Sequence, residues 1–377
     1  MVVVDFFRHA VNWLSEPSRF FLLTTVAFVL LLFPGEIGPQ WLRSATRPLV
    51  AVYRPRVAAI LFAALGVLFT IACFDPNFQK IVLKPDNVPI AGMIFLVLFF
   101  VWFALQQARD NDRRAAEGRA FLEKEEAGDP KVMVWPDLVY TEFICMILFT
   151  VFLVIWSIFL KAPIEEPANP AKTPNPSKAP WYFLGLQEML VYFDPWIAGV
   201  LLPGLIIVGL MAIPYIDTNP KGNGYYTIRE RKWEIAIFLF GFAVLWVWLI
   251  VIGTFFRGPN QNFFGPFEYW DVHKVVPLIN IDLSQVIWVS LFGVGLPKNL
   301  FVREIFGLLI VLVYFLAPPP LLARGPLKHF HEKMGPARFH VMVFLGLTML
   351  SLPIKMLLRW MFNMHYLVTM PEIFFNI

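Results

Sequence analysis

The sequence predicts an all-α, polytopic membrane protein, and its composition and its long apolar stretches both point that way. Of the 377 residues, 58% are hydrophobic and 16% aromatic, but only 15% are charged, against about 25% in an ordinary soluble domain. A bilayer core of about 30 Å is crossed by about 20 mostly apolar residues in a helix. We therefore expect a transmembrane helix bundle of about eight spans.

Eight apolar stretches alternate with polar loops. They cover residues 20–35, 57–74, 89–108, 138–160, 197–215, 234–256, 304–322 and 340–360. The first stretch is short before Pro34, so the count falls to seven if this stretch is tilted or lies in the interface. Asp5, Arg8 and Glu16 interrupt the region before it. We therefore expect no cleavable signal peptide, and the first span would direct insertion.

The basic residues predict the orientation of the chain in the membrane. If the spans alternate, the loops 36–56, 109–137, 216–233 and 323–339 share one side and hold 18 of the 31 lysines and arginines. Basic loops face the cytoplasm in most membrane proteins. Both termini and the two long loops at 161–196 and 257–303 then lie outside, where loops of such length tend to be functional. Lys355 and Arg359 in the last stretch are expected to extend toward the outer interface.

These patterns divide the chain into four parts. We expect an amino-terminal three-span appendage (1–110), a charged cytoplasmic linker (111–135), a core (136–256), and a long outer loop with two further spans (257–377). The linker mixes acidic and basic residues, which is typical of a hydrated helical connector. The outer loops need protein or water around their backbone near a bilayer, so they are expected to fold back onto the bundle.

Several classes of function find no support in the residues. The sequence has no phosphate-binding glycine loop, nucleophile elbow or zinc-ligand spacing, and we expect no nucleic acid partner. Cys73 and Cys145 are expected to serve in packing. Of the six histidines only His340 lies in a predicted helix, so this chain alone is expected to hold no b-type haem. The central helices carry few ionisable residues, which argues against a secondary transporter.

A series of motifs begins after the linker. In order, they are Pro-Asp-Leu at 136–138, Glu-Pro-Ala-Asn-Pro-Ala-Lys-Thr-Pro at 166–174, Ala-Pro-Trp-Tyr-Phe at 179–183, Gly-Val-Leu-Leu at 199–202 and Ile-Pro-Tyr-Ile-Asp at 213–217. This order resembles the carboxyl-terminal domain of cytochrome b, equivalent to subunit IV of cytochrome b6f-type complexes. The likeness is strong over about 80 residues and extends to about 120 if the stretch from Trp233 to Gly253 is included.

The resemblance implies a subunit of a bacterial quinol:cytochrome c oxidoreductase of the Rieske/cytochrome b type, in the cytoplasmic membrane of a respiratory chain, with menaquinol or ubiquinol as substrate. Quinol would bind at a site shared with partner chains, and activity would exist only in the complex. Haem b would lie on a cytochrome b partner and an iron–sulfur cluster on a Rieske-type protein, with a cytochrome c as acceptor. The alternative is a structural or assembly subunit without its own quinol chemistry.

The resemblance also assigns site residues. Pro180, Trp181, Tyr182 and Phe183 match the quinol-binding motif, in which the aromatic rings would pack the quinol and the Tyr182 hydroxyl would hydrogen-bond to it. The other interpretation is that Trp181 and Tyr182 are interfacial belt aromatics. The charge-based orientation places this motif on the outer side, where the family has its quinol-oxidation pocket.

One departure from the family concerns the proton acceptor. The family has an acidic residue where this chain has Pro180, and proline cannot accept a proton. Glu188, in the predicted amphipathic helix that follows, is the nearest substitute, and Asp194 is the next. A carboxylate half-buried in an apolar pocket has a raised pKa and becomes a usable base; the alternative is that Glu188 is a structural acid. Arg257, at the end of a span, is expected to anchor a loop or to bind a carboxylate.

Overall fold

The structure of the protein is a computed structural model that describes residues 2–126, 132–161, 167–219 and 226–377. Parts of three segments used in the sequence argument lie outside the described residues: 127–131 of the charged linker, 162–166 with Glu166 of the proline-rich motif, and 220–225 of a basic loop. All the candidate site residues lie within the described residues.

The described part of the chain is almost entirely helical. The elements are α1 (Val2–Leu14), α2 (Pro17–Leu32), α3 (Gln40–Thr46), η1 (Arg47–Tyr53), α4 (Pro55–Ala72), α5 (Pro76–Val82), α6 (Val88–Ala116), α7 (Leu122–Glu126), η2 (Val134–Leu138), α8 (Val139–Phe159), η3 (Trp181–Phe183), α9 (Leu184–Met189), η4 (Ile197–Leu201), α10 (Leu202–Ile216), α11 (Ile228–Leu239), η5 (Phe240–Val247), α12 (Trp248–Val251), η6 (Ile252–Phe256), η7 (Pro259–Gln261), η8 (Gln285–Leu291), α13 (Leu300–Leu316), α14 (Pro318–Arg324), α15 (Lys328–Met334), α16 (Pro336–Phe362), β1 (Thr369–Met370), η9 (Pro371–Ile373) and β2 (Phe375–Asn376).

The predicted all-α transmembrane bundle is confirmed. By length and composition, seven helices in the described residues are able to cross a membrane: 55–72, 88–116, 134–159, 197–216, 228–256, 300–324 and 336–362. An eighth span results if α1 and α2, which are bent by 84° at Ser15–Glu16, count as one. Each of the eight predicted stretches thus corresponds to a helix, and the uncertain one is the first, as expected.

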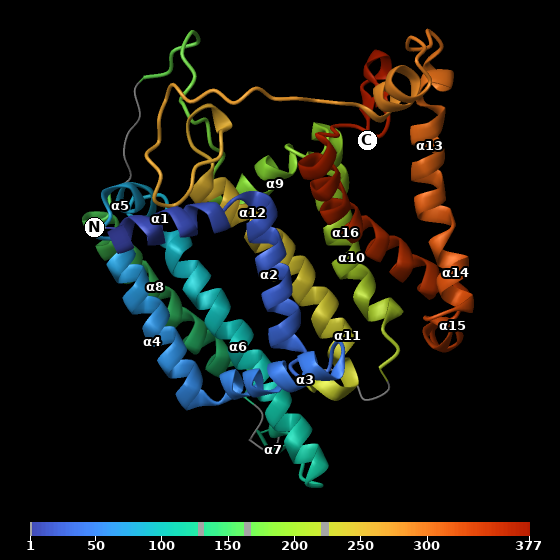
Figure 1. Cartoon of the computed structure of the whole chain (residues 1–377). Helices are drawn as coiled ribbons and strands as arrows, with labels where there is room; N and C mark the ends of the chain where they lie inside the picture. The colour runs from blue at the N-terminus through green and yellow to red at the C-terminus, as the bar shows by residue number, and fades with distance from the viewer. Residues whose placement is uncertain (1, 127–131, 162–166, 220–225) are drawn as a thin grey trace.

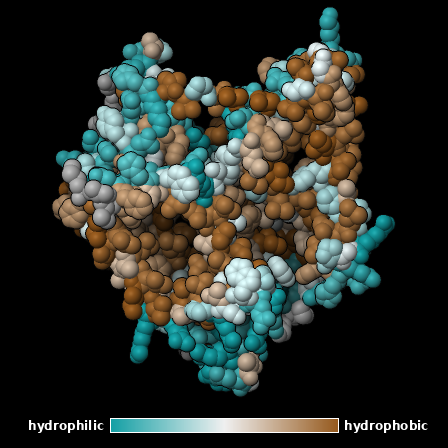
Figure 2. Space-filling view, in the orientation of Figure 1, coloured by the Kyte–Doolittle hydropathy of each residue, from teal (hydrophilic) through white to brown (hydrophobic). Residues whose placement is uncertain are grey.

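The spans run up and down between two ends of the molecule (Figure 1). One end, called here the basic end, holds the segment 33–54 with α3, and also α7, α14 and α15. The other, called the loop end, holds α5, α9, the segment 167–180 and the segment 257–299. An apolar belt lies between two more polar regions in Figure 2, as a bilayer requires of a spanning bundle.

The largest core cluster joins the amino-terminal spans to the rest. Phe21 of α2 and Ile90 of α6 pack in the same cluster as Trp248 of α12 and Met356 of α16. The Phe21 ring lies 5.3 Å from that of Trp248 and 5.7 Å from that of Trp360. The first three spans therefore form one wall of a common core, while the exact domain boundaries given above stay a prediction.

At the basic end, α6 continues for two turns beyond its apolar stretch and positions α11. The Asp112 carboxylate accepts hydrogen bonds from the backbone N–H groups of Ile228 at 3.2 Å and Arg229 at 3.2 Å, which caps the start of α11. Asn111 is fully buried; its side chain donates to Glu123 and to the Tyr226 carbonyl and accepts from the Leu122 N–H. Part of the predicted hydrated linker is thus a structural part of the bundle.

The segment after α16 closes the loop end. The strands β1 and β2 form a small antiparallel sheet, and the Glu304 carboxylate of α13 accepts a hydrogen bond from the Thr369 N–H at 3.0 Å. Lys355 and Arg359 point to this end but are buried: Lys355 donates to the His365 carbonyl and Arg359 to the Ile279 carbonyl. Both side chains bind backbone carbonyls of loops that fold back onto the bundle. The predicted direction of the two side chains is therefore right, but they do not reach the solvent at the interface.

Gly307 marks the closest approach between α13 and this carboxyl-terminal segment. A Cβ atom at this position would overlap the Leu367 carbonyl oxygen. We expect Gly307→Ala to destabilise the protein by about 1–3 kcal/mol, because a well-packed contact has no room for an added methyl group. Thermal unfolding in detergent measures the effect. Gly66→Ala in α4 is the matched control, since a Cβ there meets nothing within 4 Å; equal melting temperatures for the two variants would contradict the prediction.

Candidate functional site

The aromatic motif forms a short turn at the loop end, directly before a buried helix. Pro180 precedes η3, which contains Trp181, Tyr182 and Phe183, and the Phe183 N–H donates to the Pro180 carbonyl at 2.8 Å. These three rings, called here the aromatic triad, are 41%, 52% and 50% exposed. They touch in sequence order, with centroids 5.7 and 4.8 Å apart. The triad therefore presents an apolar surface outward.

The helix behind the triad, α9, packs closely on the span that ends in η6. A Cβ on Gly185 would lie 3.3 Å from the Trp246 ring, and one on Gly253 would lie 3.2 Å from the Leu184 carbonyl oxygen. Glycine on both sides of the crossing lets the two backbones approach. This contact fixes the position of α9, and with it the direction in which the aromatic triad faces.

The proline-rich segment before the motif is bound to the loop that follows η6. Asn175 and Asn260 exchange two hydrogen bonds, in which the Asn175 side chain donates at 3.0 Å and accepts at 2.6 Å. The Ser177 carbonyl accepts from the side chains of both Gln187 and Gln261. The segment thus folds back onto the bundle, as predicted, and it holds Pro180 at the start of η3.

Glu188 lies behind the triad in a buried ion pair with Arg257. Only 3% of Glu188 is exposed, and Arg257 donates to both of its carboxylate oxygens, at 2.9 and 2.7 Å. Burial lowers the pKa of Arg257, but the charge and hydrogen bonds of Glu188 outweigh it and raise this pKa above its usual range. Arg257 also donates to the Gln261 carbonyl at 3.1 Å. Both predicted roles of Arg257, carboxylate binding and loop anchoring, are therefore present.

This environment differs from the apolar pocket that the sequence suggested for Glu188. Both oxygens of the Glu188 carboxylate are occupied by Arg257, so this acid is held as part of a structural ion pair. Asp194, the second candidate base, is held by the carboxyl-terminal segment, since its Oδ2 accepts from the Tyr366 hydroxyl at 3.2 Å and from the Asn376 side chain at 2.9 Å. Glu188 is the candidate base nearer to the triad along the chain. Asp194 belongs to a separate hydrogen-bond network with the carboxyl-terminal segment.

Lys178 is a residue that the sequence reasoning did not single out. Its ammonium donates to the Thr254 carbonyl at 2.7 Å and lies 4.9 Å from the centre of the Trp270 ring. Burial lowers the pKa of Lys178 to about 7, and the positive charge of Lys84 acts in the same direction. The chain therefore places a second titratable group two residues before Pro180. The pKa of Lys178 is lowered because the fold buries it. The sequence pattern around Lys178 does not show this burial.

The histidines do not fit a b-type haem held by this chain alone. Such a haem needs histidines on facing spans, and among the seven straight candidate spans only α16 contains one, His340. His340 lies near the start of α16 at the basic end, and its Nδ1 is 2.6 Å from the Pro336 carbonyl oxygen. The helix α1, which contains His9, lies toward the loop end (Figure 1).

The Glu188–Arg257 pair is expected to be required for stability. Glu188→Gln leaves a buried guanidinium without its partner, and we expect a loss of about 3–5 kcal/mol. The double variant Glu188→Gln/Arg257→Gln removes both charges and is expected to recover most of that loss. Chemical unfolding of the three proteins in detergent measures this. Glu332→Gln, which breaks the exposed pair with Lys328, is the control and should change little; a single variant as stable as this control would contradict the prediction.

The lowered pKa of Lys178 predicts unusual reactivity. Its amine is expected to be half deprotonated near pH 7, whereas an ordinary lysine titrates near about 10.4. Labelling with acetic anhydride at several pH values, followed by peptide mass spectrometry, measures this: reaction at Lys178 should reach half its maximum near pH 7. Trp270→Ala uncovers the amine and should move the midpoint upward. A midpoint near pH 10 in the unmodified protein would rule out the burial effect.

Comparisons with known proteins cover the part of the chain that contains this site. Residues 167–264 match the family model of the cytochrome b carboxyl-terminal/b6/petD domain. Among curated proteins, cytochrome b of Allochromatium vinosum is 30% identical over 112 residues, which are 28% of this chain and 27% of that protein. The alignment thus spans about a quarter of the relative's length. No solved structure matches the chain. The region that carries the aromatic triad, Glu188 and Arg257 is a cytochrome b-type carboxyl-terminal domain.

Proposed function

We propose that this chain is a membrane subunit of a quinol:cytochrome c oxidoreductase complex and that it forms one wall of the quinol-oxidation site. The observation that carries the proposal is the aromatic triad, which is exposed on its outer face and fixed from behind by α9 and the Glu188–Arg257 pair. An apolar surface beside buried polar groups suits a quinone ring with two hydroxyl groups. The family match covers this same segment.

The proposed site residues act by binding and positioning. Trp181 and Phe183 would pack against the quinol ring, and the Tyr182 hydroxyl would hydrogen-bond to a quinol oxygen. Pro180 keeps the backbone extended before η3, with φ −53° and ψ 150°. Oxidation of one quinol gives one quinone, two protons and two electrons. The electrons would pass to an iron–sulfur protein and a haem on partner chains, so this chain supplies the wall and a proton route.

Two residues are candidates for the first proton acceptor. Glu188 has a carboxylate, and both of its oxygens accept hydrogen bonds from Arg257. Lys178 has an amine with a pKa of about 7, so a neutral form is present at physiological pH. Thr254 Oγ1 and Trp270 Nε1, near Lys178, are buried without a hydrogen-bond partner among the described residues, and buried groups of this kind commonly bind water. Such water would carry the proton outward.

The helix α8 supports the proposal that partner chains complete the site. In the apolar part of the span 134–159, none of the residues is buried within this chain. In the span 228–256 the buried share is 50%. The proposed partners are a haem-carrying cytochrome b, a Rieske-type iron–sulfur protein and a cytochrome c or similar acceptor. A bacterial cytoplasmic membrane, with the basic end toward the cytoplasm, fits the positive-inside rule; menaquinol or ubiquinol would be the substrate.

One observation favours a second function. The Glu188 carboxylate is held by Arg257, and Pro180 stands where the family has an acid. A structural or assembly subunit that retains the fold without its own quinol chemistry would have this arrangement too. The two functions differ in what a change at the aromatic triad does to quinol oxidation.

The test purifies the complex through a tag on this chain and measures its haem spectrum, its subunits and its quinol oxidation rate. We expect a b-type haem on another subunit. Tyr182→Phe should slow the reaction by up to about tenfold, as expected for the loss of one hydrogen bond. Tyr215→Phe, at the far end of α10, is the matched control because Tyr215 is also exposed and should have no effect. A protein without haem or partners would contradict the electron-transfer proposal.

Two further variants identify the proton acceptor. Glu188→Gln/Arg257→Gln removes the carboxylate without leaving a buried charge, and Lys178→Met removes the amine. Loss of general-base catalysis costs about 10²–10⁴-fold in rate. The variant with such a loss names the acceptor, and its pH–rate profile should lose the corresponding limb. Full activity in Tyr182→Phe and in both of these variants would favour the structural subunit.

A further inference from the structure

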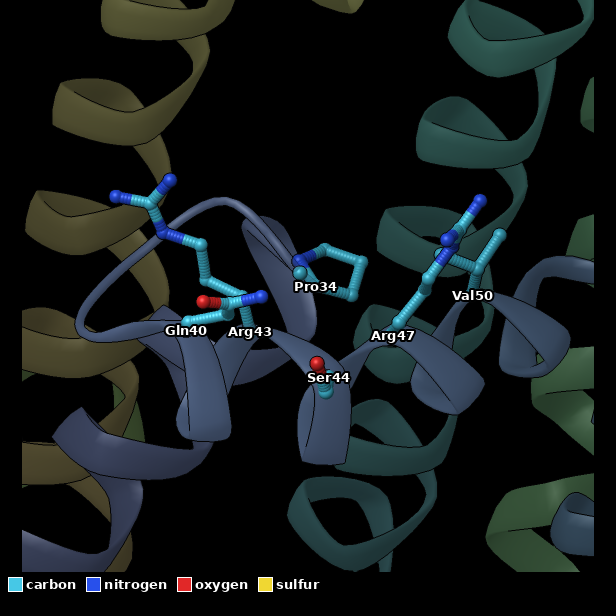
Figure 3. A pocket seen from close by; sticks show the side chains of 7 residues that line it. Pro34, Gln40, Arg43, Ser44, Arg47 and Val50 are labelled. Carbon is cyan, nitrogen blue, oxygen red and sulfur yellow. The ribbon is translucent and has the colours of Figure 1, made fainter.

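A cavity at the basic end carries an inference independent of the quinol site. It has a volume of about 290 Å³ and lies where the segment after α2 turns into α3 and η1. Its lining residues are Pro34, Gly35, Gln40, Arg43, Ser44, Arg47 and Val50. Four of these seven carry polar or cationic side chains. Figure 3 shows the Arg43 and Arg47 side chains on opposite sides of Pro34, with their guanidinium groups directed apart, and Ser44 on the helical turn between them.

The two arginines have no carboxylate to neutralise them. No acidic side chain in the described part of the chain forms an ion pair with Arg43 or Arg47, and the nearby Glu36 is paired with Lys232 at 3.4 Å. Arg43 donates through Nε to the Gly38 carbonyl at 2.7 Å, which fixes the direction of its guanidinium. Two guanidinium groups with a hydroxyl and an amide form a donor set suited to a phosphate group.

A glycine turn beneath the cavity holds α3 in place. Gly35 has φ +78°, in the left-handed region, and a Cβ at this position would lie 3.4 Å from the Arg47 Cβ and 3.5 Å from the Arg43 carbonyl oxygen. The Gly35 N–H donates to the buried Thr46 hydroxyl at 3.1 Å, so the turn is tied to α3. Glycine thus makes this left-handed turn and lets it pack against the backbone of Arg43 and Arg47.

The position of the cavity identifies the source of the phosphate. The helix α3 lies between the end of the α2 span and the start of the α4 span, across the direction of the spans (Figure 1). Trp41 on α3 is 70% exposed, and tryptophan is enriched at the level of lipid headgroups. Basic pockets at the ends of spans bind the headgroups of acidic lipids. Exposed Ile37 and Val50 beside the arginines provide apolar contact for acyl chains.

We propose that the Arg43–Arg47 cavity binds the phosphate group of an anionic membrane phospholipid. The guanidinium groups would hold the phosphate, Ser44 and Gln40 would donate to its oxygens or to the headgroup, and Trp41 would keep α3 at the interface. Such a lipid would link the amino-terminal spans at the basic end, where the segment 33–54 joins α2 to α4.

Native mass spectrometry of the full chain in detergent tests this proposal. The probes are phosphatidylglycerol, which is anionic, and phosphatidylcholine, which is neutral overall. We expect phosphatidylglycerol to bind in preference, and Arg43→Gln/Arg47→Gln to weaken its binding by about tenfold or more, since each guanidinium would lose a charge-assisted hydrogen bond to the phosphate. Arg54→Gln/Arg56→Gln is the matched control: it removes the same charge at the nearby start of α4, from residues that do not line the cavity, and it should leave binding unchanged.

Each other outcome overturns the proposal. Equal loss in the cavity and control variants would mean general attraction between charges rather than a site. If inorganic phosphate binds through these arginines and phosphatidylglycerol is not preferred, the cavity is a site for free anions and not for a lipid. Because Arg43 also holds Gly38, Arg47→Gln alone is the second variant. Among the described residues, no hydrogen bond or ion pair involves the Arg47 guanidinium, so this variant should fold. Unchanged lipid binding in Arg47→Gln would refute the assignment, even if the double variant misfolds.

Discussion

The buried pair between Glu188 and Arg257 is the interaction on which the loop end depends. It connects α9 to the residue where the span 228–256 ends, and Arg257 passes the connection on to the loop 257–262 through the Gln261 carbonyl. That loop in turn holds Asn175 and Ser177 of the proline-rich segment. A charge pair in an apolar core is costly to bury and tolerates few geometries. The aromatic triad therefore owes its fixed direction to two side chains that lie 69 residues apart in the sequence.

Much of the fold could be predicted because spans are long apolar runs, and a bilayer makes such runs unambiguous. The ends of the helices were less certain. The α6 helix runs to Ala116, since no proline or glycine interrupts the charged residues that follow the apolar stretch, whereas hydropathy stops at Arg109. The motif order gave the family and the candidate residues. It did not give the pairing of Glu188, the burial of Lys178 or the capping of α11 by Asp112, because each depends on contacts between distant segments.

The family-like region is not an independent unit in this protein. Its Trp248 is packed between Phe21 of α2 and Trp360 of α16, both outside the segment that matches the family. The spans outside the family match thus belong to the same core as the matched region. Changes in α2 or α16 would therefore reach the site by way of the α12 side of this core, which lies directly behind α9.

The carboxyl-terminal segment also has a consequence for biogenesis. Spans enter the membrane in the order of their synthesis, and α10 and α13 are made before the residues that join them at the loop end. Thr369 reaches Glu304 of α13, and Tyr366 and Asn376 reach Asp194 beside α10. These contacts form only once α16 has crossed the bilayer and delivered the segment to the far side. Until then Asp194 and Glu304 lack these partners, so the loop end closes only after the last span has been inserted.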